Sequence, residues 1–356
     1  MSADPLYTQP DTGRAAYSMC DAEVERAYHD VLTSWGVFES NYGVLQLIGE
    51  DCLDFLQRLS TNDLNDIVPG SQRSTTLTTE KGRVVDIVTV LHLEQELLLL
   101  TTLGRRKVVR EWLEHFIITE RVEIIDVTQL YEIISVAGPH AESQMKNIFM
   151  LGEIESPEFI IRRHPSPSNT MIGIQDTRWS IPKYDVLVKS GASYNEVRMQ
   201  LNIVSKAHQP AVKEILRVEQ RVVSVDSDID ANTNPLEARL DAIVSFTKGC
   251  YIGQEVIARL DSYKKLQRIL HLVQFSSSAA VVSGPGSIYS GENRVGCTTS
   301  HVWSYHYKGH IAMGYVKIGI LPDALEYRSD DSSFRCDIVA FLPPLSFPIT
   351  NLLSGE

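Results

Sequence analysis

The sequence contains few cysteines, and none of them pair at short spacing. Five occur in 356 residues, widely scattered as Cys20, Cys52, Cys250, Cys297 and Cys336. An odd, scattered set argues against a disulfide framework and for a reducing compartment, so we expect a cytoplasmic protein. Because no Cys-x-x-Cys pair occurs, we expect no zinc or iron–sulfur site, and no other metal site, from this chain alone.

Positive charge and long apolar runs are also scarce. The formal net charge is −12, so the basic surface of a nucleic-acid-binding protein is missing. No apolar run approaches the roughly 20 residues of a membrane span. The first five residues carry an acid and no apolar segment, which is unlike a signal peptide. We therefore expect neither a nucleic acid nor a membrane as a partner.

The patterning that is present predicts an α+β protein of two or three domains. Strands are predicted over 42–48 and 84–93 because these segments alternate or are almost wholly apolar. Helical periodicity appears over 21–32, 107–116 and 210–218. The first 20 residues are polar and contain two prolines, so we interpret them as a loose arm.

The character of the chain changes after Arg268. Short strands separated by Gly and Pro turns predict a small β-barrel domain over 268–356. His301, His306 and His310 fall in one predicted barrel loop, but no carboxylate or cysteine pattern accompanies them. We interpret them as surface histidines rather than as metal ligands.

The stretch 248–255, Lys-Gly-Cys-Tyr-Ile-Gly-Gln-Glu, is the most unusual in the chain. Gly249 and Gly253 suit tight backbone or the close approach of a ligand. A nearby lysine would lower the pKa of the Cys250 thiol, although cysteines often serve as small buried hydrophobes. The flanking segments predict a buried strand over 244–246 and a helix over 256–260.

This stretch resembles the K-G-C-Y-x-G-Q-E signature of the YgfZ/GcvT-like family. These folate-binding proteins are related to the aminomethyltransferase (T protein) of the glycine cleavage system. Segments 49–63, 135–141, 296–300 and 311–316 also resemble the family. The resemblance implies a multi-domain GcvT-like folate-binding fold, with two interleaved subdomains over 21–267 ahead of the C-terminal barrel. It also implies tetrahydrofolate, or another reduced folate, as the ligand.

Two carboxylates follow from the resemblance as folate-binding residues. One segment, Leu216-Arg217-Val218-Glu219, resembles the transferases' LRLE segment, whose glutamate holds the pterin. On charge pattern alone, Glu219 could instead be a surface acid paired with Arg217 or Arg221. Asp86 falls where Gly82–Asp86 resembles a transferase segment with an aspartate near the reactive nitrogens of folate. Asp86 is then a general acid/base or an orienting group, or else an edge-strand aspartate without function.

The remaining candidate residues belong to the signature stretch. Cys250 joins Asp86 as a candidate catalytic residue. Lys248 could anchor the folate tail, lower the pKa of the thiol or be solvated, while Gln254 and Glu255 suit capping of the following helix. The folate-binding residues are therefore predicted to be Asp86, Arg217, Glu219, Lys248, Gly249, Tyr251, Gly253 and Gln254, around one central cleft.

Three functions fit this pattern. The cysteine-bearing branch of the family is linked to assembly or repair of iron–sulfur enzymes, including those that thiolate tRNA. This implies a folate-binding accessory protein whose partners are assembly proteins or client enzymes. A one-carbon transferase or demethylase is the alternative, and a folate-binding scaffold without chemistry is the third. Phe38-Glu39-Ser40-Asn41-Tyr42 departs from the transferases' FDxSHM, and Ile87 replaces a second acid. We therefore expect the protein not to act as a glycine-cleavage aminomethyltransferase.

Overall fold

The computed structural model describes residues 21–149, 162–163, 170–189, 192–201, 210–263, 265–276, 284–320, 325–329 and 333–339. The predicted arm over 1–20 lies outside these residues. In the part of the chain that is described, no helix is both long and apolar enough to span a membrane.

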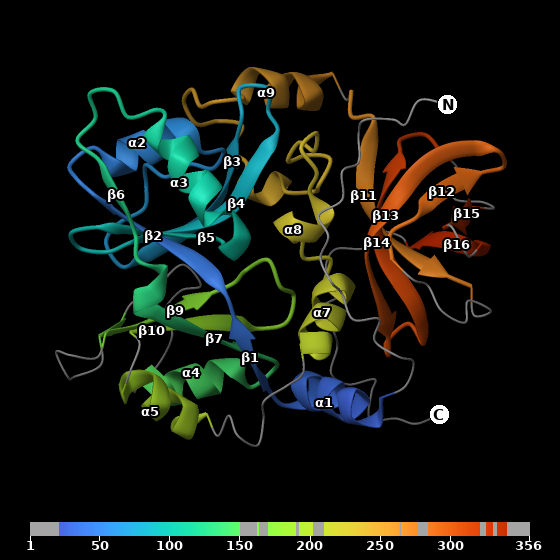
Figure 1. Cartoon of the computed structure of the whole chain (residues 1–356), viewed down its shortest axis with the longest axis horizontal. Helices are drawn as coiled ribbons and strands as arrows, with labels where there is room; N and C mark the ends of the chain where they lie inside the picture. The colour runs from blue at the N-terminus through green and yellow to red at the C-terminus, as the bar shows by residue number, and fades with distance from the viewer. Residues whose placement is uncertain are drawn as a thin grey trace.

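Helices and strands alternate irregularly along the chain (Figure 1). The α-helices are α1 (Ala22–Thr33), α2 (Cys52–Leu59), α3 (Arg106–Glu114), α4 (Ala141–Phe149), α5 (Ala192–Gln200), α7 (Pro210–Glu219), α8 (Val225–Asp228) and α9 (Gln254–Ser262). The strands before the barrel are β1 (Gly36–Ser40), β2 (Tyr42–Ile48), β3 (Ser71–Thr78), β4 (Val84–His92), β5 (Leu97–Thr102), β6 (Glu123–Asp126), β7 (Tyr131–Ala137), β8 (Arg162–Arg163), β9 (Thr170–Gln175) and β10 (Lys183–Lys189).

Two five-stranded sheets form the first part of the molecule. Their strand orders are β3-β4-β5-β2-β6 and β1-β7-β10-β9-β8, and the described strands within each sheet pair antiparallel. The chain enters the second sheet with β1, builds the first with β2 to β6, and then returns to the second. The two sheets are thus interleaved in sequence, while the division into separately folding domains stays a prediction.

Six strands close into a barrel after Arg268. They are β11 (Arg268–Phe275), β12 (Ser287–Ser290), β13 (Asn293–Ser304), β14 (Gly309–Lys317), β15 (Leu325–Arg328) and β16 (Ser333–Val339), in the order β11-β14-β13-β12-β15-β16. Closure leaves no free sheet edge, which removes a route to aggregation. The predicted α+β class with a small C-terminal barrel is confirmed.

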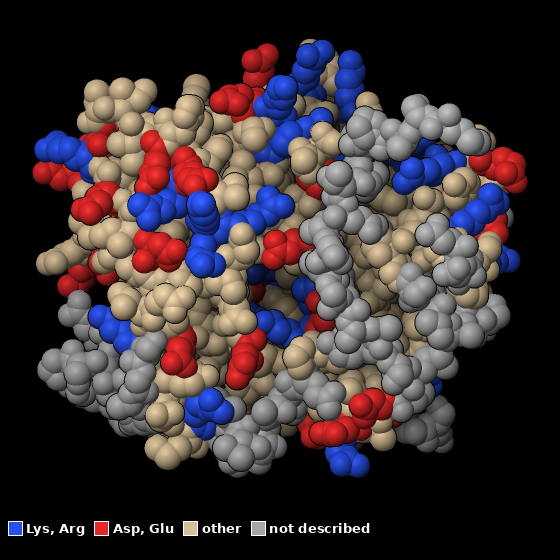
Figure 2. Space-filling view, viewed as in Figure 1, with Lys and Arg blue, Asp and Glu red and all other residues tan. Residues whose placement is uncertain are grey.

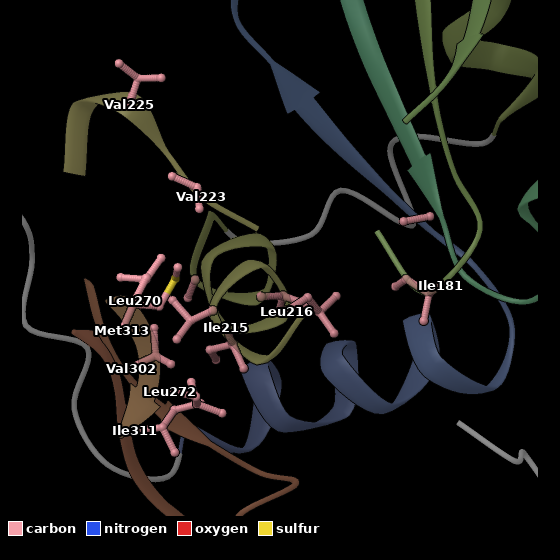
Figure 3. Close-up of a cluster of buried hydrophobic side chains, with 14 of the residues drawn as sticks. Ile181, Ile215, Leu216, Val223, Val225, Leu270, Leu272, Val302, Ile311 and Met313 are labelled. Carbon is pink, nitrogen blue, oxygen red and sulfur yellow. The ribbon is translucent and has the colours of Figure 1, made fainter. Parts of the chain in front are cut away.

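Helix α7 joins the sheets to the barrel (Figure 1). Its apolar side chains point to two sides of the helix. Ile215 points toward barrel residues such as Leu272 and Ile311, whereas Leu216 points toward Ile181 of the sheet region (Figure 3). All of these side chains are buried. Because burying one such side chain stabilises by about 1.5–3 kcal/mol, this shared core holds the two parts together.

Most predicted elements are confirmed, with two corrections near the signature stretch. The predicted strand over 244–246 is wrong: a 3-10 helix (Asp241–Ile243) precedes it, and Phe246 is 46 % exposed. Helix α9 begins at Gln254 with Gly253 as its N-cap, and no side-chain hydrogen bond caps it. The expected capping by Gln254 and Glu255 is therefore wrong, because the glycine's left-handed φ of 83° makes the turn without a polar side chain.

Candidate functional site

A cavity of about 420 Å³ lies between the two sheets and the α7–α8 segment. Figure 2 shows a hollow near the centre of this face, with basic and acidic side chains around it. One wall comes from β3, β4, β5 and the turn after them, with Ser74, Ile87, Leu100, Thr102 and Gly104. Mixed apolar and polar walls in a cavity of this size are typical of small-molecule sites.

The facing wall carries a buried network of opposite charges. The Lys183 Nζ lies 2.8 Å from both Asp185 carboxylate oxygens, and Arg178 donates two hydrogen bonds of 2.8 Å to Asp176. Tyr42 donates a further bond to Asp185. Burial raises the pKa of Asp176, but Arg178 and Lys183 outweigh it and hold that pKa well below its usual range. The two positive charges of Lys183 and Arg178 are thus compensated by the two negative charges of Asp176 and Asp185.

Lys213 of α7 also lines the cavity, beside this network. Its Nζ donates to the Ser40 hydroxyl at 2.8 Å and to the Glu39 carbonyl oxygen at 3.2 Å. Burial, with the nearby charge of Lys183, lowers the pKa of Lys213 to about 8. Lys213 is therefore still mostly protonated at neutral pH.

Asp86 lies beside the cavity and does not line it. The side chain is fully buried, and it accepts hydrogen bonds from the backbone N–H groups of Ile87 and Thr102 and from the Thr102 hydroxyl, at 2.7–3.0 Å. Burial raises its pKa to about 6 despite these donors. The resemblance predicted that this group lies in the folate cleft. In the structure its burial is compensated by hydrogen bonds from Ile87 of β4 and Thr102 of β5.

Arg217 connects α7 to the barrel. Its Nε and Nη2 bind the two Glu214 carboxylate oxygens, and its Nη1 binds Asp228 at 2.7 Å and the Val222 carbonyl oxygen at 2.6 Å. Nη2 also donates to the hydroxyl of Ser300 on β13. Since a guanidinium has five N–H donors, these contacts use all of them. Arg217 thus has a structural role, and it also lines the cavity, so its role in folate binding stays a prediction.

Glu219, at the end of α7, points toward α1 and the barrel. Tyr28 of α1 donates to one carboxylate oxygen at 2.8 Å, and Ser304 of β13 donates to the other at 2.5 Å. The side chain is 2 % exposed, and burial raises its pKa to about 7. The surface-acid alternative is therefore wrong. Glu219 is also absent from the cavity lining.

Lys248 holds the signature stretch against the end of α2. Its Nζ donates to the carbonyl oxygens of Gln57, Ser60 and Asn62 at 2.7, 2.9 and 2.6 Å. Carbonyl groups at a helix C-terminus lack partners within the helix and favour a cation. Burial lowers the pKa of Lys248 to about 8. The solvated-lysine alternative is wrong, because Lys248 is buried and its three donors are occupied, while a role as folate-tail anchor stays a prediction.

The rest of the signature stretch divides between surface and interior. Cys250 is exposed, and a Cβ added at Gly249 would meet no atom within 4 Å. Tyr251 packs in a buried cluster with Ile257. A Cβ at Gly253 would come within 2.6 Å of the Thr79 carbonyl oxygen, so this glycine allows close packing of the turn against the sheet. By contrast Cys52 is buried, as its helical position predicts.

The structure does not bring the predicted residues into one cleft. Asp86 lies behind one cavity wall, Glu219 lies at the barrel contact, and none of residues 248–254 lines the cavity. These residues therefore lie in three separate places, and their roles in folate binding stay predictions. Among the described residues there is also no metal-binding cluster, and His310 is buried on β14 against Trp303 rather than at the surface.

The sequence reasoning missed the charged cavity wall. A signal was available, because Lys183 and Asp185 alternate within an otherwise apolar strand and so face the same side of β10. Two opposite charges at this spacing in a buried strand indicate an internal ion pair. Asp176, Arg178 and Lys213 come from other segments, and only the tertiary fold brings them there.

Comparison with known proteins relates this chain to the aminomethyltransferases. Residues 7–160 match the GCVT N-terminal domain. The chain is 26 % identical over 281 residues to a putative chloroplastic transferase of Arabidopsis thaliana, covering 78 % of this chain and 64 % of that protein. It is 26 % identical over 250 residues to an aminomethyltransferase of Chlorobium phaeovibrioides, covering 65 % and 66 %. These matches span just under two thirds of the lengths of both relatives.

A solved structure shares most of this fold. The glycine cleavage system aminomethyltransferase T from Bartonella henselae superposes with a TM-score of 0.77 at 17 % identity, covering 89 % of this chain and 88 % of that one. This likeness reports on the fold alone. The chain has a GcvT-like fold with mixed α/β content and a closed six-stranded C-terminal barrel, and the matches support a GcvT-like, aminomethyltransferase-related family without separating its cysteine-bearing branch from the transferases.

Proposed function

We propose that the chain binds tetrahydrofolate, or another reduced folate, in the central cavity. The observation that carries this proposal is the cavity itself, about 420 Å³ within a GcvT-like fold and lined by apolar and polar groups together. Ile87, Leu100 and Trp179 offer apolar surface for a ring system. Hydroxyl and charged groups on the other walls offer hydrogen bonds that orient a polar ligand.

Two glycine variants distinguish the cavity from the signature stretch as the binding place. A Cβ at Gly104 would lie 3.8 Å from the Asp226 carboxylate across the cavity, so Gly104→Phe should fill the space that a ligand needs. Gly249→Phe adds the same ring where no atom lies nearby. Calorimetry with tetrahydrofolate should show binding to the native chain and to Gly249→Phe, but not to Gly104→Phe. The reverse pattern would move the site to the signature stretch.

We further propose an accessory role in assembly or repair of iron–sulfur enzymes, such as those that modify tRNA, in the cytoplasm. The exposed Cys250, outside the cavity, supports a thiol that meets a partner protein at the surface. The buried Asp86, whose carboxylate is occupied by three donors, supports a folate site without acid–base chemistry at that residue. No relative reported above is named for such a role, so this part rests on the signature stretch.

Complementation of a gene deletion tests the accessory role. The native gene should restore the activity of iron–sulfur enzymes, including tRNA thiolation, and Cys250→Ser should not. Cys52→Ser is the matched control, although its buried thiol makes a folding check necessary. Full restoration by Cys250→Ser would remove the surface thiol from the proposal.

A folate-dependent aminomethyltransferase, or another one-carbon transferase or demethylase, is the second candidate. The names of the relatives favour it, since both the Chlorobium protein and the Bartonella structure are aminomethyltransferases. Under this alternative the cavity would hold folate beside a second substrate.

A further inference from the structure

The cavity is lined by four cations, and three of them are already matched by anions. Lys183 contacts both oxygens of Asp185, and Arg178 makes a two-point contact with Asp176. Arg217 binds Glu214 and Asp228, and no N–H donor remains on it. None of these three can offer an uncompensated charge to a ligand.

Lys213 is different from the other three. Among the described residues its Nζ contacts only two neutral oxygens, those of the Ser40 hydroxyl and the Glu39 carbonyl group. An ammonium group has three N–H donors, so one is left over. Removal from water and repulsion from Lys183 lower its pKa, and the carboxylates of Asp185, Glu214 and Asp176, with which Lys213 forms no ion pair in the described structure, offset this only in part. Keeping such a charge is costly unless an anion compensates it.

We propose that Lys213 binds an anionic group of the ligand in the cavity. With a reduced folate, this group is a carboxylate of the glutamate tail, and Lys213 then selects tailed folates over pterins without a tail. This inference rests on the proposed folate binding. It also moves the proposed tail-binding role from Lys248 to Lys213, because all three N–H donors of Lys248 bind backbone carbonyl oxygens at and just after the end of α2.

The test compares two ligands on matched variants. Calorimetry is run with tetrahydrofolate and with 6-methyltetrahydropterin, which carries the reduced ring but no tail. Lys213→Met should weaken tetrahydrofolate binding by about ten- to a hundred-fold, the range for loss of a hydrogen bond to a charged group, and leave the pterin affinity unchanged. Lys213→Arg keeps the charge and should retain most of the affinity. Lys107→Met, at an exposed position on α3, is the control.

Each other outcome has a definite meaning. Equal tetrahydrofolate affinity in the native chain and Lys213→Met would overturn the inference, and so would equal weakening of both ligands. If the native chain binds tetrahydrofolate and Lys213→Arg binds as weakly as Lys213→Met, charge is not the property that matters, which also overturns it. If the native chain binds neither ligand, the proposed function itself fails, and this inference fails with it.

Discussion

Asp86 and Glu219 are carboxyl groups in the interior whose donors differ in kind. Asp86 receives two backbone N–H groups, from Ile87 of β4 and Thr102 of β5, which cannot turn into acceptors. Glu219 receives one backbone N–H, that of His306, and the hydroxyl groups of Tyr28 and Ser304, which can rotate and accept a hydrogen bond instead. Burial raises both pKa values, to about 6 and about 7. Replacing the carboxylate by an amide should nevertheless destabilise the protein at Asp86 and stabilise it at Glu219.

Asp86→Asn should therefore destabilise the protein. One amide nitrogen would face the Thr102 N–H, and two donors cannot bond to each other. A buried donor without a partner costs about 1–3 kcal/mol, so the free energy of unfolding at pH 7.5 should fall by that amount. Urea unfolding followed by circular dichroism measures it. Asp226→Asn is the control, because the Asp226 side chain is 49 % exposed, and it should change little. An unchanged Asp86→Asn would show that the three donors contribute nothing to the fold.

At the scale of elements, the contact of α1 and α7 with the barrel contains a titratable group without a cation. Glu219 takes hydrogen bonds from α1 and from β13, and it has no ion-pair partner among the described residues. Arg217, two residues earlier, uses Asp228 and Ser300 to join α7 to the barrel by a compensated pair. The same helix thus has one pH-insensitive and one pH-sensitive connection.

Glu219→Gln should stabilise the protein at alkaline pH. The folded-state pKa of about 7 is above the unfolded value of 4.5, so the folded chain prefers the neutral form. The stability from this group is fully present below pH 4.5 and is lost as pH rises through 7. Glutamine stays neutral, so the variant should gain about 1–3 kcal/mol over the native chain at pH 8.5 and less than about 1 kcal/mol at pH 5.

Paired urea titrations at the two pH values check this difference. Glu111→Gln, on the exposed face of α3, should show the same small difference at both. A gain from Glu219→Gln that is equal at pH 5 and pH 8.5 would mean that the carboxyl group does not titrate in this range.

At the scale of the whole molecule, periodic patterns predicted the elements, and the tertiary contacts decided the site. The apolar period of 210–218 predicted α7, and the Gly- and Pro-separated strands predicted the barrel. The sequence could not show that Glu219 faces Tyr28, which is 191 residues away along the chain. It also could not show that Lys248 reaches the end of α2, because every residue has a backbone carbonyl group and the sequence does not indicate which of them bind a lysine. The family resemblance gave the fold but placed three separate groups in one cleft.

The protein should not act as a glycine-cleavage aminomethyltransferase. That reaction passes a carbon from an aminomethyl-lipoyl carrier to folate, and it requires a proton-transfer group oriented toward both reactants. The Asp86 carboxylate, the matched candidate, is outside the cavity lining and occupied by three donors, and Cys250 is at the surface. Supplied with aminomethylated lipoyl carrier and tetrahydrofolate, the protein should release methylenetetrahydrofolate and ammonia at far below about one turnover per second. Any residual rate should be the same in the Cys250→Ser variant. Turnover at about one per second or faster would overturn the accessory role and establish the transferase, and loss of that turnover in Gly104→Phe would place it in the cavity.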